Sequence, residues 1–239
     1  MWQLGAQALA FAWLTNGTWA LATQAADGMT PPQVLVPGHV MPSSVWPDGR
    51  IAAVRGTRME VGNPDMVIVT VENGIARVEP LLQTPNNEQQ PQLSRDGRWL
   101  LYPSNVSGQF EIYVRANPGS DAPVPVSTDS GFSAAWHPNG REIFFVALRR
   151  DPAGKYPMMT AAFTPGSPPT IGRPRELFRF DNGDLAMACT PFRCYDVAPD
   201  GQRFYAVQSV ASPPVPPVTH INLITNWFEE LKAKAPVKR

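Results

Sequence analysis

The sequence holds few residues that could do acid–base, nucleophilic or metal chemistry. Its three histidines are His39, His137 and His220, and neither His39 nor His220 has a cysteine or carboxylate at the spacing of a metal site. His137 stands in a turn position that Ser94 and Ala198 occupy in other copies of the same motif, which indicates a structural role. No Gly-x-Ser-x-Gly nucleophile motif occurs. The sequence therefore predicts no catalytic residue, no bound metal and no cofactor.

Kinase motifs are also missing. The chain has no His-Arg-Asp catalytic loop, no Asp-Phe-Gly and no glycine-rich phosphate loop before a lysine-bearing strand. The run from Leu148 to Asp151 shares only an Arg-Asp pair with a catalytic loop, and the Pro-Ala-Gly turn after it is the wrong context. We therefore expect that this chain is not itself an enzyme.

The only cysteines are Cys189 and Cys194, five positions apart. In an oxidising compartment they could form a disulfide across the loop that enters the last repeat. Two free thiols fit the same spacing, and the sequence leaves both alternatives open. The spacing differs from the Cys-x-x-Cys of redox catalysts, so it does not predict redox chemistry.

A turn motif recurs four times and organises the rest of the chain. It contains an Asp-Gly or Asn-Gly pair, a strong hairpin signal for which type I′ geometry predicts positive φ at both residues. Successive pairs are 48, 43 and 61 residues apart, and the first two intervals match the ~40–50 residues of a four-stranded propeller blade. We expect these residues to be structural, bonding their own loop backbone. They are Asp48 and Gly49, Asp96 and Gly97, Asn139 and Gly140, and Asp200 and Gly201.

The N-terminal segment carries a weaker copy of this repeat. A shift of 91 residues places Gly17 on Gly108 and Trp19 on Phe110. The segment is apolar like a signal peptide, but no Lys or Arg precedes Arg50, so the basic region of a signal peptide is missing. We therefore interpret it as a first blade. If Met1 is not the true start, the chain would open partway through a repeat.

These repeats predict an all-β chain folded as a β-propeller of about five four-stranded blades, or as an incomplete six- or seven-bladed propeller. The apolar residues at the entrances of the turns, Trp46, Leu93, Trp136 and Val197, are expected to pack between blades. The propeller should span 1–211, and 212–239 should hold a proline-rich linker, a last strand and a short helix that packs on the propeller. The expected blades cover 1–36, 37–84, 85–128, 129–180 and 181–211.

Bulk properties exclude several functions. The 20 basic and 20 acidic side chains balance and form no dense basic run, which argues against nucleic acid as a partner. No stretch of about twenty apolar residues occurs, so we expect no membrane insertion within this chain. A propeller that lacks blades would leave an apolar sheet face in water, and self-association is expected in that case.

The mouth of the central channel is where we expect a protein partner or small ligand to bind, because loops from every blade converge there. Residues just before the innermost strands would line this mouth: His39, Asn87, Glu88, Phe132 and Arg193. They combine acidic, basic and aromatic groups. The competing interpretation is that they are ordinary solvated loop residues.

The repeat resembles that of TolB-like propellers. The likeness is carried by Gln90 to Arg115, Tyr195 to Phe204 and Ile224 to Leu231, which contain the Pro-Asp-Gly turn, a Ser-Asn-x-Ser-Gly loop and an Ile-Tyr-Val strand. It is most similar to propellers that follow a transmembrane helix in bacterial receptor-type serine/threonine kinases. This resemblance implies an extracytoplasmic propeller of six or seven blades used for sensing or protein contact, whereas this chain has about five repeats.

On this resemblance we interpret the chain as a non-catalytic binding or sensing module of a larger receptor-kinase-like protein, outside the cytoplasm. Two alternatives stay open. One is the propeller of a prolyl-oligopeptidase-type (S9) peptidase without its hydrolase domain. The other is a stand-alone TolB-like periplasmic scaffold that binds a protein partner.

Overall fold

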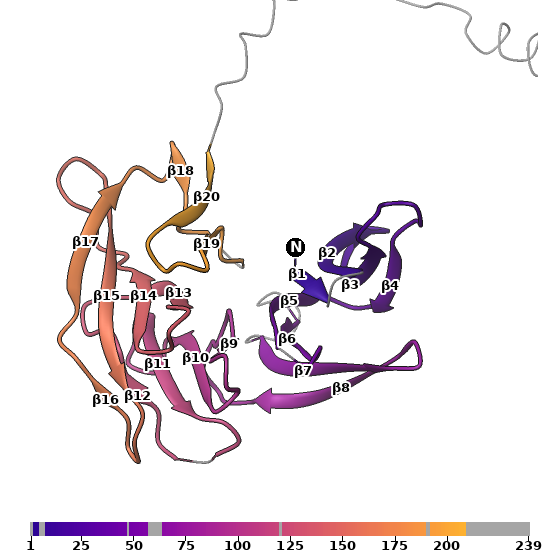
Figure 1. Cartoon of the computed structure of the whole chain (residues 1–239), viewed down its shortest axis with the longest axis horizontal. Helices are drawn as coiled ribbons and strands as arrows, with labels where there is room; N and C mark the ends of the chain where they lie inside the picture. Colours follow the sequence, from indigo (N-terminus) through magenta and orange to yellow (C-terminus); the bar gives the residue numbers. More distant parts are fainter. Residues whose placement is uncertain are drawn as a thin grey trace, which may run out of the picture. The chain divides into compact units, whose positions relative to one another are not determined.

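The computed structural model describes residues 2–4, 8–46, 48–56, 64–119, 121–189 and 192–208. These residues form five antiparallel β-sheets that follow one another along the chain, the five-blade arrangement of a β-propeller (Figure 1). They all belong to one compact unit, Met1–Ser209. These ranges hold no helix and hence none that could cross a membrane. The predicted all-β propeller is confirmed, whereas the last strand and helix predicted within 212–239 lie outside the described residues.

The first three blades are four-stranded sheets whose strand order follows the sequence. The first comprises β1 (Trp2–Leu4), β2 (Ala8–Thr15), β3 (Thr18–Ala25) and β4 (Gln33–Val36). The second comprises β5 (Val40–Val45), β6 (Ile51–Arg55), β7 (Asp65–Glu72) and β8 (Ile75–Leu82). The third comprises β9 (Gln92–Leu93), β10 (Trp99–Ser104), β11 (Glu111–Ala116) and β12 (Val124–Pro125).

Among the described residues, the last two blades depart from the expected four strands. The fourth has β13 (Phe132–Trp136), β14 (Glu142–Val146), β15 (Tyr156–Thr164), β16 (Thr170–Ile171) and β17 (Arg175–Phe180), and both β16 and β17 pair with β15. Pro174 separates β16 from β17, since proline has no N–H to continue a ladder. The fifth has β18 (Leu185–Ala186), β19 (Tyr195–Val197) and β20 (Phe204–Gln208), in the order β18-β20-β19.

The four repeated turns keep their predicted position but not their predicted type. The glycine has positive φ in each pair, for example 71° at Gly97, whereas Asp48, Asp96, Asn139 and Asp200 are not among the described residues with positive φ. Gly97 N donates to Ser94 O at 2.8 Å, which closes a tight turn just before the glycine. The pattern is that of a type I turn followed by a glycine in the left-handed conformation. A type I′ turn would need positive φ at the Asp or Asn as well, so the type I′ prediction was wrong here.

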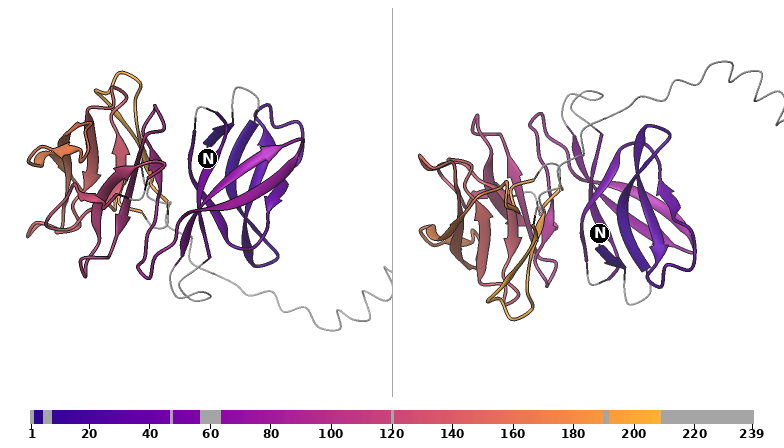
Figure 2. Two further views of the ribbon diagram at one scale, coloured as in Figure 1. Left: turned by 90° about the horizontal axis from the view of Figure 1, so that it is seen from below. Right: turned by 90° about the horizontal axis from the view of Figure 1, so that it is seen from above.

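True type I′ geometry occurs at two other turns. Asn73 and Gly74, between β7 and β8, have φ of 52° and 77°, and Asn16 and Gly17, between β2 and β3, have φ of 50° and 75°. The Asn73–Gly74 turn closes a long twisted hairpin, visible in Figure 2 as the purple and magenta strands. The mirror-image turn matches the twist of strands of this length.

Four apolar clusters lie between successive blades, as expected when stacked sheets bury both faces. The cluster between the third and fourth blades includes Trp99, Phe145 and Phe163. The rings of Trp99 and Phe163 pack edge to face, with their centroids 5.2 Å apart. Three of the residues expected to pack between blades, Leu93, Trp136 and Val197, are half-buried at the edges of these clusters, and Trp46 is buried under the guanidinium of Arg50.

Candidate functional site

Polar groups from four blades, some of them backbone carbonyls, meet on or just before the inner strands β5, β9, β13 and β19. We call this set the hub and define it by the following residues: Ser43, Ser44, Gln89, Gln90, Gln92, Ser133, Cys189, Arg193 and Tyr195. Unlike the polar residues of the repeated turns, most of these bond to a different blade. The hub therefore joins blades through hydrogen bonds in addition to the apolar clusters.

The connection to the fifth blade centres on the carbonyl of Cys189. Gln90 Nε2 donates to Cys189 O at 3.1 Å, and Ser133 Oγ donates to the same oxygen at 3.5 Å. Gln90 and Ser133 both have positive φ, 45° and 49°, although neither is glycine. Such backbone costs about 1–3 kcal/mol and persists only where surrounding contacts hold it. The hub therefore contains two strained residues that point to the same acceptor.

A disulfide fixes the segment that carries this carbonyl. Cys189 and Cys194 are bonded, with their Cα atoms 5.7 Å apart. Of the two alternatives that the sequence left open, the structure has the disulfide. The bond closes a short loop just before β19 and so sets the position of both Cys189 and the residues that follow Cys194.

Tyr195 and Arg193 reach back from the fifth blade to the fourth. The Tyr195 hydroxyl donates to Ser133 O at 2.6 Å, and Arg193 Nη1 donates to Ala134 O at 3.5 Å. Arg193 also pairs with Asp196 at 3.1 Å and lies over the ring of Tyr195. Burial raises the pKa of Tyr195 above its usual value. The phenol therefore stays protonated and keeps donating at neutral pH.

The second and fourth blades attach to the third through the segment around β9. Ser44 Oγ donates to Pro91 O at 2.9 Å, and Gln92 Nε2 donates to Ser43 O at 3.5 Å. On the other side, Trp136 Nε1 donates to Gln92 O at 3.5 Å. The Gln90–Gln92 segment thus contacts three other blades.

Some polar atoms of the hub are buried and make no hydrogen bond within the described part of the chain. They are Gln89 Oε1, Gln90 Oε1 and Arg193 Nε. Gln90 is only 2% exposed, and the side chain of Arg193 is 11% exposed. A buried donor or acceptor without a partner costs about 1–3 kcal/mol. These atoms are two acceptors and one donor that the described residues leave without a hydrogen-bond partner.

The residues predicted at the channel mouth have different partners in the structure. Arg193 belongs to the hub. Asn87 and Glu88 are buried just before it: Asn87 N donates to Asn105 Oδ1 at 2.8 Å, and Glu88 Oε1 accepts from Thr84 Oγ1 at 2.6 Å and from Ser104 Oγ at 3.2 Å. These hydrogen-bond partners all lie in the third blade or in the loop that enters it, so these two residues hold that loop in place.

His39 and Phe132 have local roles in the structure. The backbone of His39 donates to Trp19 O at 2.7 Å and accepts from Gly56 N at 2.9 Å, which ties the first blade to the second. Phe132 is 3% exposed and packs edge to face on Phe110 at 5.2 Å. In the part of the chain that the structure describes, no hydrogen bond or ion pair joins Glu88 to Arg193, whose carboxylate partner is Asp196.

Sequence reasoning missed Gln90, Ser133 and Tyr195. The polar run from Asn87 to Gln92, directly before an inner strand, could have indicated a polar site there. The positive φ of Gln90 and Ser133 could not have been predicted, because neither Gln nor Ser favours that backbone conformation. Among the described residues there is no group of three or more His, Cys, Asp or Glu that could hold a metal ion.

Comparison with known proteins finds similarity in structure and not in sequence. No protein-family model matches the chain, and no curated protein is significantly similar to it. TolB from Acinetobacter baumannii is similar in structure, with a TM-score of 0.58 at 17% identity over 88% of this chain and 49% of TolB.

Two enzymes are similar as well. A puromycin hydrolase has a TM-score of 0.54 at 16% identity, with 84% of this chain and 34% of the hydrolase covered. The periplasmic gluconolactonase PpgL from Pseudomonas aeruginosa has a TM-score of 0.52 at 16% identity, with 88% of this chain and 63% of PpgL covered. The chain thus spans between one third and two thirds of the length of these proteins. At such low identity the likeness establishes the fold alone, which is that of a β-propeller.

Proposed function

We propose that the chain is a binding module that holds a segment of a partner polypeptide at the hub. The observation that carries this proposal is the set of buried, unpartnered groups: two amide oxygens and one guanidinium N–H. A polypeptide backbone offers N–H donors and C=O acceptors, which match this set. The strained backbone at Gln90 and Ser133 supports the proposal, since such strain gathers at binding sites.

Photo-crosslinking tests this proposal. A photoreactive phenylalanine replaces exposed Asp196 beside the hub, and the matched control replaces exposed Val106 on the third blade. We expect one protein adduct from position 196, identified by mass spectrometry, and none from 106. Arg193→Lys, which keeps the charge but removes Nε, should weaken the adduct. Equal adducts from both positions, or no adduct from 196, would contradict the proposal.

We further propose that this module acts outside the cytoplasm within a receptor-kinase-like protein. The disulfide supports an oxidising compartment. The resemblance of Gln90 to Arg115 to the propeller repeats of receptor-type kinases supports the kinase context. The measurement is the mass of the native gene product, detected by an antibody to this segment. A membrane-bound species far above 26.2 kDa agrees with the proposal, and a soluble species near that mass contradicts it in favour of a stand-alone scaffold.

A second candidate is the propeller of a peptidase, favoured by the structural likeness to a puromycin hydrolase. The same measurement separates the two candidates. A large soluble product that reacts with a fluorophosphonate serine-hydrolase probe would support the peptidase. A large membrane product that does not react with the probe would support the receptor.

A further inference from the structure

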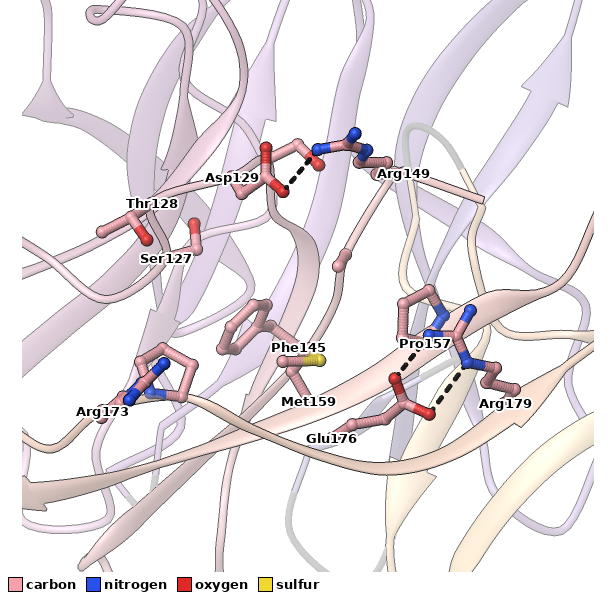
Figure 3. Close-up of a pocket in the computed structure, with 13 residues that line it drawn as sticks. Ser127, Thr128, Asp129, Phe145, Arg149, Pro157, Met159, Arg173, Glu176 and Arg179 are labelled. Carbon is pink, nitrogen blue, oxygen red and sulfur yellow. Dashed lines mark hydrogen bonds and ion pairs between the residues drawn. The ribbon is translucent and has the colours of Figure 1, made fainter. Parts of the chain in front are cut away.

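A pocket of about 420 Å³ lies on the fourth blade, apart from the hub (Figure 3). Its walls come from the loop between β12 and β13, from the end of β14 and from β17. Phe145 and Met159 form its apolar floor at the edge of the cluster between the third and fourth blades. The volume lies within the range of about 300–1,000 Å³ that small-molecule sites occupy.

The rim of the pocket carries three arginines, of which one is uncompensated. Arg149 pairs with Asp129 at 3.2 Å, and Arg179 pairs with Glu176 at 2.7 Å. Arg173 is exposed and makes no ion pair within the described part of the chain. The rim therefore offers one free guanidinium above an apolar floor.

The wall opposite β17 is held rigidly by a buried carboxylate. Glu111 is 4% exposed and accepts from Ser127 Oγ and, at 2.8 Å, from Ser130 N. Ser130 Oγ in turn accepts from Leu148 N at 3.0 Å. A Cβ at Gly131 would lie 2.5 Å from Ser127 Oγ, so only glycine fits there. The pocket is thus formed before a ligand arrives, which lowers the ordering cost of binding.

We propose that this pocket binds a monoanionic carboxylate that carries an apolar group. The apolar group covers Phe145 and Met159, and the carboxylate meets the Arg173 guanidinium, whose planar fork suits two parallel hydrogen bonds. The ion pairs of Arg149 and Arg179 stay as they are and exclude a second anionic group. The proposal does not depend on binding at the hub.

The test uses 3-phenylpropionate as the probe, with 3-phenylpropanol and 3-phenylpropylamine as matched compounds. Two-dimensional NMR of the ¹⁵N-labelled protein follows the titration at low salt. We expect shifts confined to the amides of the pocket, affinity highest for the acid, and weaker binding in higher salt. Shifts spread over the whole protein, no shifts, or equal affinity for the acid and the alcohol would overturn the proposal.

Two arginine variants complete the test. Arg173→Gln should weaken 3-phenylpropionate about three- to fivefold and abolish the preference over the alcohol, as expected for loss of one exposed charge-assisted contact. Arg175→Gln removes the same charge from the exposed neighbour on β17 that does not line the pocket, and should change nothing. Equal effects of the two variants would mean that only net charge matters, and the proposal would fall.

The same carboxylate chemistry occurs at the C-terminus of a peptide that ends in an apolar residue. Titration with N-acetyl-Ala-Phe, as the free acid and as the amide, distinguishes a peptide C-terminus from a small carboxylic acid as the natural ligand. Binding of the free peptide acid at least as tight as that of 3-phenylpropionate identifies a peptide C-terminus as the ligand, and no peptide binding identifies a small molecule.

Discussion

The repeated turns and the hub use the same kinds of polar side chain in opposite ways. At the turn before β10, the carboxylate of Asp96 accepts from Ser94 Oγ at 2.6 Å and from the backbone and side chain of Arg98, all within two residues. At the hub, Gln90 and Ser133 bond to Cys189, which is 99 and 56 residues away. Repeated polar residues therefore build each blade, whereas unrepeated ones join blades and are the better candidates for function.

One turn breaks this rule and gives the largest predicted effect. Gly97 and Gly201 have nearly equal φ, 71° and 69°. A Cβ at Gly97 would meet nothing within 4 Å, but at Gly201 it would lie 2.1 Å from Nε2 of His137 in the fourth blade. The His137 ring is held in place because Asn139 N donates to its Nδ1 at 3.0 Å. The turn of the fifth blade is thus packed against its neighbour, and that of the third is not.

We expect Gly97→Ala to lower the free energy of unfolding by about 1 kcal/mol, the cost of positive φ in alanine. Gly201→Ala should cost about 3 kcal/mol, since overlap with His137 adds to the φ cost. Urea unfolding of both variants measures the difference. In a double-mutant cycle, His137→Ala should remove most of the excess cost of Gly201→Ala. Equal costs at the two glycines would show that all turns are self-contained.

The second prediction concerns the disulfide of the hub. Replacing both cysteines by serine, at positions 189 and 194, should lower the free energy of unfolding by about 2 kcal/mol, as loop-closure entropy predicts for so short a loop. The segment that carries the Cys189 carbonyl should also loosen, so amide exchange should speed up at Gln90, Ser133 and Tyr195 and stay unchanged at the turn around Asp96. Uniform acceleration across the protein would argue against a local role.

A third, smaller effect comes from the Tyr195 hydroxyl. Tyr195→Phe leaves the Ser133 carbonyl without its donor and should cost about 1 kcal/mol. Because burial raises the folded-state pKa of Tyr195 above its unfolded value near 10, stability is full below pH 10 and falls as the pH rises beyond it. Tyr195→Phe should therefore flatten the alkaline limb of a pH–stability curve. Part of the limb should remain, since burial also raises the pKa of Tyr102 to about 12.

The sequence carried enough information for the blades because their signals are local. Alternation and an Asp-Gly pair every 40–50 residues depend on residues next to one another, and those features predicted the sheets around β5 to β14 closely. The hub could not be predicted in the same way. Gln90 becomes important only through Cys189, and Ser133 only through Tyr195, and no repeat or motif links residues that far apart. The strand order of the fifth blade was also not predicted. There β18, which comes before the inner strand β19 in the sequence, pairs with β20, and no local pattern indicates this pairing.

The smallest predicted effect concerns the acid limb of the pH–stability curve, where the free energy of unfolding falls at low pH. It tests whether the carboxylates of the repeated turns are structural. Hydrogen bonds from the Arg50 side chain, from Ser94 and from the Gln202 backbone hold the pKa values of Asp48, Asp96 and Asp200 below the usual 3.8. Above that value both folded and unfolded states are ionised and the contribution is full. As the pH falls below it, the unfolded state takes up protons first, and stability is lost until the folded carboxylates are protonated too.

Asn139 shows that this position does not need a charge. Its Oδ1 accepts from Arg141 N at 2.8 Å, the bond that Asp96 Oδ1 makes with Arg98 N at 3.1 Å. The triple variant Asp48→Asn, Asp96→Asn and Asp200→Asn should therefore stay folded at neutral pH with only a slight loss of stability, because exposed ion pairs contribute little. Its acid limb should be flatter than that of the parent chain. If the variant instead lost binding at the hub while remaining folded, the division between structural turns and a functional hub would be wrong.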